Sequence, residues 1–353
     1  MKIAILGTLH KPICKEAMGG TESFTYYLTE GLVDRGEDIV LFAHPDSKTS
    51  AKLISDGIVT SEMHIDPFWP NQINSLKNAL DYILKEGDFD IVHNNLYETY
   101  PAMFISGLVK KIGTSFVSTV HNDLLTMTDT FKIFQQYQKE NYVFVSKFAR
   151  DNAKGDLSNK FFVYNGVSID DYKPVSSPKG DYILWLSRIA EGKGLEDAIL
   201  ASKKVGKKII FAGLIDSVKN QNFFENKVKP LIDNKQVVYI GAVESEEKLK
   251  IYQNASALLM PVKWDEPFGL VACEAMACGT PVIAYKKGAL PELIVDGKTG
   301  YLVEEGDINA LSAKIKEVSR IDRSQCRVRV EENFTVGKMI DGYERMYQTI
   351  IRN

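Results

Sequence analysis

The sequence predicts an α/β protein of two domains, each built on a doubly wound parallel β-sheet. Short apolar runs rich in β-branched and aromatic residues recur along its 353 residues, and segments with helical spacing lie between most of them. Strands that alternate with helices favour a parallel sheet covered on both faces. The same alternation occurs twice, on either side of a polar, proline-containing stretch at 170–180. We therefore expect two such domains joined at that stretch.

The apolar runs place the strands. In the first domain they are 3–6, 38–43, 89–93, 116–121, 142–145 and 161–164, and in the second 182–186, 208–212, 237–240, 257–261, 282–285 and 300–303. The helical segments include 21–35, 195–204 and 245–254, where apolar residues recur at helical spacing. We place an N-terminal Rossmann-like domain at 1–170 and a C-terminal one at 171–335. The amphipathic segment 336–353 predicts a last helix that could pack back on the first domain.

The composition is that of an ordinary globular protein, with 44% apolar and 25% charged residues. A net charge of −3 gives no electrostatic reason to expect binding to nucleic acid. The four cysteines are irregularly spaced, which favours reduced thiols over disulfides or a zinc site. The apolar run in the opening residues is too short and too quickly broken to predict a signal peptide, and no apolar run reaches the 18 residues expected of a membrane span. We expect a cytoplasmic protein with at most peripheral contact at the inner membrane face.

The most informative stretch is 265–281, which follows the expected strand 257–261. Pro267 suits the first position of a helix, where its missing N–H is not needed, and Gly279 would end that helix. The amino end of such a helix presents unpaired N–H groups and the positive end of its dipole, which favours a phosphate. The backbone groups concerned belong to Phe268, Gly269 and Leu270.

Two carboxylates frame this predicted anion site. Glu266 lies in the turn, and Glu274 lies two helical turns further on, in a helix that is apolar nearly all round. A lone Glu in such a helix must be hydrogen-bonded, because an unpaired buried charge is costly. A purely structural role for Glu274, capping a neighbouring backbone, therefore stands beside a functional one.

Other polar residues follow strands of the first domain, at the edge where ligands bind in parallel sheets. Gly19 and Gly20 open a helix and would let a backbone approach a ligand, although such a pair also simply starts helices. His93 and His121 end two expected strands. We read His93 as a core or supporting residue and His121 as functional. The dinucleotide fingerprint GxGxxG is absent, which argues against a dehydrogenase.

In the second domain, Arg188 and Lys193 flank a glycine-bearing turn after the strand 182–186. Two cations beside a helix amino end can bind a diphosphate, with Arg as a bidentate donor and Lys as a point charge. The alternative is a pair of solvated surface cations. The diphosphate interpretation is favoured because this turn and the one at Glu266 both follow strands of the same sheet.

These residues together resemble the retaining glycosyltransferases of family 4, the group-1 type, which have the two-domain GT-B fold with two Rossmann-like domains facing across a cleft. The resemblance covers nearly the whole chain. It rests on Gly19-Gly20-Thr-Glu, His121, Asn165-Gly166-Val167, Arg188 with Lys193, Glu266-Pro-Phe-Gly-Leu to Glu274, Pro291-Glu292-Leu293-Ile294 and Gly300-Tyr-Leu-Val. The opening segment and the compact length are similar to a subgroup that includes the avilamycin-pathway glycosyltransferase.

The resemblance implies roles for residues of the second domain. Arg188 and Lys193 would hold the donor diphosphate and stabilise it as it leaves. Glu266 would contact sugar hydroxyls, and Glu274 would accept hydrogen bonds from the ribose. The backbone N–H groups of 268–270 would bind sugar and phosphate.

In the first domain, the resemblance implies that His121 reaches the donor sugar and that the Gly19-Gly20 loop approaches phosphate or acceptor. One position departs from the family pattern, because Ser168 stands where the family often has Asp. This departure concerns the joint between the domains and not the chemistry.

The implied reaction transfers a hexose or N-acetylhexosamine from a nucleoside-diphosphate sugar, with a UDP-sugar as the first expectation and GDP-mannose as a further candidate. The acceptor would be a glycan, a lipid-linked molecule or a small molecule. A retaining enzyme without an evident nucleophile implies front-face attack, in which the leaving phosphate takes the acceptor proton. We accordingly assign Glu266 to orientation.

We expect no metal and no cofactor beyond the donor as co-substrate. Asp88-Phe89-Asp90 spells a DxD metal signature, but it precedes a strand at the edge away from the expected site. Two alternatives share the fold: a phosphorylase-type enzyme that uses inorganic phosphate, and a non-catalytic subunit that binds nucleotide sugars.

Overall fold

The computed structural model describes every residue except 18, 58–67, 98, 123–131, 133 and 353. Its contacts divide the chain into two compact units. Unit 1 comprises Met1–Gly166 together with Val336–Asn353, and unit 2 comprises Val167–Thr335. The chain thus leaves unit 1 after Gly166, a little before the expected boundary at 170, and returns to it at Val336.

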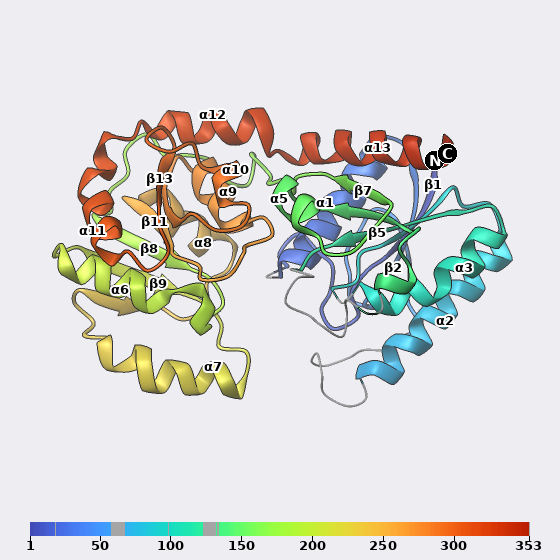
Figure 1. The fold of residues 1–353 in the computed structure, drawn as a ribbon, viewed down its shortest axis with the longest axis horizontal. Helices are drawn as coiled ribbons and strands as arrows, with labels where there is room; N and C mark the ends of the chain where they lie inside the picture. Colours follow the sequence, from blue (N-terminus) through green and yellow to red (C-terminus); the bar gives the residue numbers. More distant parts are fainter. Residues whose placement is uncertain (18, 58–67, 98, 123–131, 133, 353) are drawn as a thin grey trace. The chain divides into compact units, whose positions relative to one another are not determined.

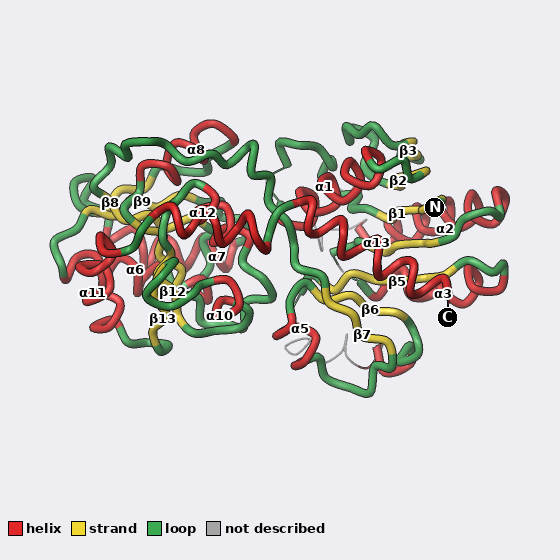
Figure 2. The backbone as a smooth tube through the Cα atoms, turned by 90° about the horizontal axis from the view of Figure 1, so that it is seen from above, coloured by secondary structure: helices red, strands yellow, loops and turns green. Residues whose placement is uncertain are grey.

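Unit 1 contains a seven-stranded sheet in the order β3-β2-β1-β4-β5-β6-β7, with all pairs parallel (Figures 1 and 2). The strands are β1 (Lys2–Leu6), β2 (Asp38–Phe42), β3 (Lys52–Ile54), β4 (Ile91–Asn94), β5 (Ser115–Val120), β6 (Asn141–Phe144) and β7 (Asn159–Phe162). The described helices are α1 (Gly20–Asp34), α2 (Phe68–Glu86), α3 (Met103–Lys111), α5 (Lys147–Asn152) and α13 (Val336–Arg352).

Both faces of this sheet are buried, and successive side chains along a strand pack on opposite faces. Ile3 and Ile5 of β1 belong to one apolar cluster with α1 and α13. Ala4 and Leu6 of the same strand belong to a second cluster with α2 and α3. This period of two is what a strand buried on both sides requires.

Unit 2 contains a six-stranded parallel sheet in the order β10-β9-β8-β11-β12-β13. The strands are β8 (Tyr182–Leu186), β9 (Lys208–Ala212), β10 (Val237–Tyr239), β11 (Ala257–Met260), β12 (Val282–Tyr285) and β13 (Gly300–Val303). The main helices are α6 (Leu195–Lys204), α7 (Val218–Phe223), α8 (Ser245–Asn254), α9 (Leu270–Ala277), α10 (Leu290–Leu293), α11 (Ile308–Glu317) and α12 (Arg323–Asn333).

Both sheets confirm the predicted fold class of two doubly wound parallel α/β sheets. In each, the strand order reverses beside the first strand: between β1 and β4 in unit 1, and between β8 and β11 in unit 2. Open parallel sheets bind ligands outside the carboxyl ends of the strands at such a reversal. Within the part of the chain that the structure describes, no helix is long and apolar enough to cross a membrane.

Candidate active site

The reversal point of unit 2 brings two turns together, one after β8 and one after β11. Gly194 adopts a left-handed φ of 73° at the end of the first turn, and a Cβ there would lie 1.8 Å from the carbonyl oxygen of Pro261 in the second. The backbone N–H of Lys263 donates to the carbonyl of Gly192 at 2.8 Å. Only a glycine-rich turn permits this approach. It places the residues that follow both strands side by side.

Lys193, Glu266 and Trp264 form the centre of this site. The Lys193 ammonium lies 2.8 Å from Glu266 Oε2, and both side chains are mostly buried. The indole N–H of Trp264 donates to the same carboxylate oxygen at 3.1 Å, and the ammonium lies 4.2 Å from the centroid of that ring. The tryptophan therefore holds both charged groups, by a hydrogen bond and by a cation–π contact.

The turn that carries Glu266 is also fixed through its backbone. The N–H of Ala289 donates to the carbonyl oxygen of Glu266 at 2.8 Å, and the N–H of Gly288 donates to Asp265 Oδ1 at 3.2 Å. These bonds come from the segment after β12, the next strand of the sheet. The orientation of the carboxylate is therefore set by three neighbouring strands.

The helix after this turn begins later than predicted. Gly269 is its N-cap with a φ of 104°, so α9 starts at Leu270 and Pro267 stays in the turn. A residue with left-handed φ cannot continue a helix, which explains the shift. The buried Phe268 ring contacts Phe334, with 6.0 Å between ring centroids. The amino end of α9 at 268–270 thus lies beside Glu266, as the predicted anion site requires.

Glu274 lies on α9 and accepts hydrogen bonds from three side chains. Its Oε1 lies 2.8 Å from Lys248 Nζ and 2.9 Å from the Tyr172 hydroxyl, and its Oε2 lies 2.8 Å from the Tyr252 hydroxyl. Burial, followed by the charge of Glu274, raises the pKa of Tyr252 well above its usual value, so this hydroxyl stays a donor. The buried carboxylate is satisfied by side chains rather than by the backbone cap considered above.

Arg188 lies apart from the Lys193–Glu266 contact. It follows β8, its side chain is 48% exposed, and it pairs with Asp216 Oδ2 at 3.0 Å. Asp216 comes from the segment after β9, the neighbouring strand, so Arg188 is held at the same edge of the sheet. Its predicted partnership with Lys193 on a diphosphate stays a prediction.

In unit 1, His121 follows β5 and is packed among neighbours. Its Nε2 lies 3.4 Å from Asn95 Oδ1, and its ring meets the Phe24 ring edge-on at 4.8 Å between centroids. Loss of hydration lowers the pKa of His121 to about 3, so the imidazole is neutral at pH 7. A neutral ring can give or accept a hydrogen bond, but its predicted contact with a donor sugar stays untested.

His93 is a core residue, one of the two roles considered for it. It is fully buried on β4, with Nδ1 2.6 Å from the Tyr347 hydroxyl of α13 and Nε2 2.7 Å from Thr119 Oγ1 of β5. Thr119 in turn lies 3.1 Å from the Tyr343 hydroxyl. This polar network joins α13 to the centre of the sheet.

Gly19 and Gly20 begin α1 at the reversal point of unit 1. The Glu22 carboxylate folds back so closely that a Cβ at Gly19 would lie 1.7 Å from its Oε2. Glu22 is buried, and its Oε1 lies 3.2 Å from both Thr8 Oγ1 and His10 Nε2. A side chain at position 19 would therefore displace the Glu22 carboxylate, a reason for glycine that the sequence reading missed.

Both aspartates of the DxD sequence accept hydrogen bonds from Lys2. Lys2 Nζ donates to Asp88 Oδ1 at 2.5 Å, and the backbone N–H of Lys2 donates to Asp90 Oδ2 at 2.7 Å. Both aspartates precede β4, at the amino ends of the strands. They join β1 to β4 at the amino-end edge of the unit 1 sheet, opposite the edge at which His121 follows β5.

Comparison with known proteins identifies the family. Residues 18–171 match the family described as Glycosyltransferase Family 4, and residues 169–333 match Glycosyl transferases group 1. The two matches together span both units. The chain is a group-1 glycosyltransferase. As a hexosyltransferase, it moves a sugar from a donor to an acceptor.

Three known proteins are similar to this chain, one in sequence and two in fold. This chain is 29% identical over 297 residues to an uncharacterized glycosyltransferase of Methanocaldococcus jannaschii. The alignment covers 79% of this chain and 80% of the relative. HepE from Anabaena, solved in complex with UDP-glucose, has a TM-score of 0.78 at 17% identity, covering 99% of this chain and 100% of that one. A glycosyltransferase involved in avilamycin A biosynthesis has a TM-score of 0.72 at 19% identity, covering 100% and 98%. These structures confirm the predicted GT-B fold.

Sequence reasoning missed three residues that the structure brings to the candidate site residues Lys193, Glu266 and Glu274. Trp264 could have been noticed, since it stands next to the motif and large aromatic residues seldom lie in turns without a contact. Lys248 and Tyr172 carry no motif and come from distant segments. The approach of Lys248 to Glu274 depends on how α8 packs against α9, and Tyr172 comes from the segment before β8.

Proposed function

We propose that this glycosyltransferase takes a hexose or N-acetylhexosamine from a nucleoside-diphosphate sugar, with UDP-sugars first, and transfers it with retention of configuration and without a metal ion. The acceptor is a glycan, a lipid-linked molecule or a small molecule. The observation that carries the proposal is the Lys193–Glu266 pair beside the amino end of α9, at the reversal point of the unit 2 sheet. The complex of HepE with UDP-glucose supports the choice of nucleotide.

The chemistry fits these groups. Breaking a glycosyl–phosphate bond leaves negative charge on the diphosphate, which preorganised donors must stabilise. Lys193 has three N–H donors, so its ammonium can keep Glu266 and also take a phosphate oxygen. Arg188 adds a second cation at the same edge of the sheet, and the 268–270 N–H groups add dipoles. Two cations and a helix end can accept this charge without a metal ion.

Glu266 is suited to orienting the sugar rather than attacking it. Its Oε2 accepts from both Lys193 and Trp264, which stabilises the carboxylate and lowers its reactivity as a nucleophile. The second oxygen can accept hydrogen bonds from sugar hydroxyls. Attack then falls to the acceptor hydroxyl on the face that the phosphate leaves, and the leaving phosphate takes the proton.

The test is donor hydrolysis and transfer by purified protein. UDP-glucose, UDP-N-acetylglucosamine and GDP-mannose are each incubated with and without EDTA, and release of nucleoside diphosphate is measured. We expect release from one UDP-sugar that EDTA does not abolish, and a retained anomeric configuration in the NMR spectrum of the product. Glycosyl phosphate formed from a disaccharide and inorganic phosphate, with no nucleotide present, would instead indicate a phosphorylase, and no turnover of any donor would indicate a non-catalytic protein.

A further inference from the structure

The Glu274 carboxylate and the Lys248 ammonium share a partly open polar site in unit 2. Lys248 Nζ reaches Glu274 Oε1 at 2.8 Å and the Tyr172 hydroxyl at 3.2 Å, which uses two of its three N–H donors among the described residues. The Lys248 side chain is 26% exposed and that of Glu274 is 10% exposed. An ammonium donor and a carboxylate acceptor are therefore adjacent, and each retains contact with solvent.

This pair lies at the ligand-binding edge of the sheet. Lys248 is in the first half of α8, which follows β10, and Glu274 is the fifth of the eight residues of α9, which follows β11. Helices that follow parallel strands begin at the carboxyl edge, so Lys248 lies toward that edge, and its contact at 2.8 Å brings the Glu274 carboxylate to it. Glu274 is on the same short helix whose amino end borders Glu266.

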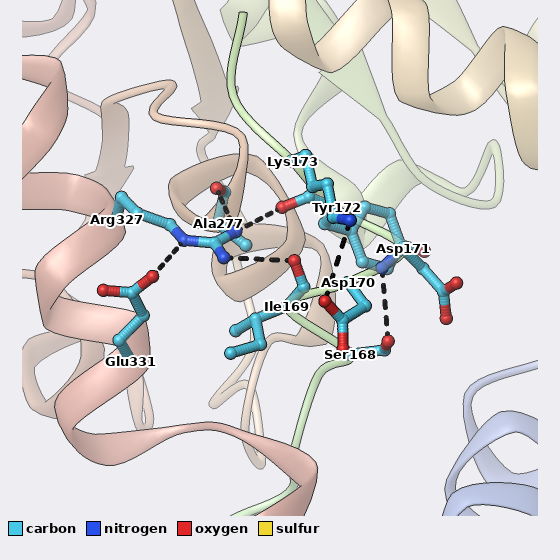
Figure 3. A network of polar contacts seen from close by, with 9 residues as sticks. All are labelled: Ser168, Ile169, Asp170, Asp171, Tyr172, Lys173, Ala277, Arg327 and Glu331. Atoms are coloured by element: carbon cyan, nitrogen blue, oxygen red, sulfur yellow. Dashed lines mark hydrogen bonds and ion pairs between the residues drawn. The ribbon is translucent and has the colours of Figure 1, made fainter.

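The backbone of Tyr172 is held in place by Arg327. Arg327 of α12 donates to the carbonyl oxygens of Tyr172 at 2.6 Å, Ile169 at 3.1 Å and Ala277 at 3.0 Å (Figure 3). The Ser168 hydroxyl accepts the N–H of Asp171 at 3.3 Å in the same turn. With its backbone fixed, Tyr172 keeps its hydroxyl directed at Glu274.

We propose that Lys248 is a nucleoside-binding residue that acts together with Glu274 on the ribose. A ribose presents two neighbouring hydroxyls, each of which can donate or accept. In this geometry one hydroxyl donates to the Glu274 carboxylate, and the other accepts from the Lys248 ammonium. The proposal rests on the proposed function, because it needs a nucleoside diphosphate as ligand, and it adds a residue and a specificity for the intact ribose diol.

A purely structural lysine would make a different prediction. If Lys248 only neutralised Glu274, its loss would weaken the binding of every nucleoside diphosphate by the same factor. If it donates to a ribose hydroxyl, its loss also removes the discrimination against the deoxyribose analogue that lacks this hydroxyl. The ratio of two affinities therefore separates the two roles, whatever happens to the absolute affinity.

The experiment measures binding by calorimetry. UDP and GDP are first compared on the wild-type protein, and the tighter ligand is then compared with its 2′-deoxy and 3′-deoxy analogues. A hydrogen bond to a charged group corresponds to about tenfold or more in affinity. We expect each deoxy analogue to bind the wild type about tenfold more weakly, and Lys248→Met to abolish that difference for one of the two analogues.

Lys250→Met is the matched control, because Lys250 is an exposed lysine of the same helix that pairs with Glu246 at 3.1 Å. It should keep the wild-type affinities and ratios. Lys248→Arg keeps the positive charge on Glu274 but alters the donor geometry, and it replaces Lys248→Met if the methionine variant does not fold. Unchanged discrimination in the Lys248 variant overturns this proposal alone. Absence of nucleoside diphosphate binding in the wild type overturns it together with the proposed function.

Discussion

The cations of the candidate site are each paired with a carboxylate, but the pairs differ in burial. Lys193 and Glu266 are mostly buried, whereas Arg188 is about half exposed beside Asp216. An exposed pair contributes little to stability, because solvent screens it and the side chains lose rotamer freedom. Arg188 is therefore the residue whose removal separates catalysis from folding most cleanly.

We expect Arg188→Ala to lower the transfer rate by roughly 10²–10³-fold, the usual effect of losing one donor to a developing anion. The melting temperature should stay within about 2 °C of wild type, since the lost pair is exposed. The measurement is kcat with a UDP-sugar donor, alongside thermal unfolding. Arg320→Ala, at an exposed position of unit 2, is the control. A rate close to wild type would remove Arg188 from the diphosphate site.

His93 gives unit 1 a pH dependence of stability. Burial, with a smaller effect of His121, lowers the pKa of His93 from 6.5 to about 3 in the folded chain. Between these values the unfolded chain binds the extra proton, so stability falls as the pH drops below 6.5. At pH 5.5 the expected loss from His93 is about 1.4 kcal/mol.

Urea unfolding at pH 7.5 and pH 5.5 measures this loss. His93→Gln can still pair with Tyr347 and Thr119, and it should show a smaller drop between the two pH values, even though its stability at pH 7.5 is lower. Hydrogen exchange of the β4 amides assigns the effect to unit 1. An equal drop in both proteins would show that His93 is not the titrating group.

At the scale of elements, the sequence predicted the strands better than the turns. Each expected strand is present, because buried parallel strands are short apolar runs that stand out from their surroundings. The strand β3 at Lys52–Ile54 was missed, since its side chains are exposed or half-buried and lack that signal. The start of α9 was misplaced because Pro267 suits a helix start, whereas only the structure shows that Gly269 has a left-handed φ.

The sequence predicts which residues of the candidate site follow a strand, but it does not predict the contacts between side chains of different helices. Glu266, Lys193 and Arg188 each follow a strand, so the sheet rule alone collects them at one edge. The approach of Lys248 to Glu274 depends instead on the packing of two helices, which no local pattern encodes. The same holds for His93, whose partner Tyr347 is distant in the chain.

Trp264 is the main positioning residue of the turn between β11 and α9. Trp264→Phe keeps a ring beneath the Lys193 ammonium but loses the indole N–H that binds Glu266, whereas Trp264→Leu loses both contacts. We expect kcat to fall about tenfold in the phenylalanine variant, as for a lost hydrogen bond to a charged group, and further in the leucine variant. KM for the donor should change less, because Lys193 and Glu266 remain present but are poorly oriented.

The measurement is the split between kcat and KM for both variants. Trp185→Phe is no suitable control, because Trp185 is fully buried in β8. Lys263→Met is a better one, since Lys263 neighbours Trp264 but points its ammonium at Asp197, 3.0 Å away. Equal kcat in Trp264→Phe and wild type would show that the Glu266 carboxylate is oriented without the indole.

At the scale of the whole chain, unit 1 is completed only by the last segment. The helix α13 buries Met339, Ile340, Tyr343, Met346, Tyr347 and Ile350 in the same cluster as the β1 side chains. The chain passes from unit 1 to unit 2 at Val167 and returns to unit 1 after Thr335. These two segments are hydrogen-bonded to each other within unit 2, where the N–H of Val167 donates to the carbonyl of Phe334 at 2.9 Å. The return of the chain is thus part of the fold and not an appended tail.

Removal of residues 336–353 should therefore unfold unit 1 while unit 2 remains folded. Each buried apolar side chain is worth roughly 1.5–3 kcal/mol, so the six of α13 together contribute about as much as the roughly 5–15 kcal/mol stability of a typical domain. Hydrogen exchange resolved along the chain measures this, with loss of protection in β1 and β4 and retained protection in β8 and β11. Tyr347→Phe, which loses only the hydroxyl beside His93, should keep both units folded. Protection of β1 in the truncated chain at the level of the intact protein would show that the sheet of unit 1 is stable without α13.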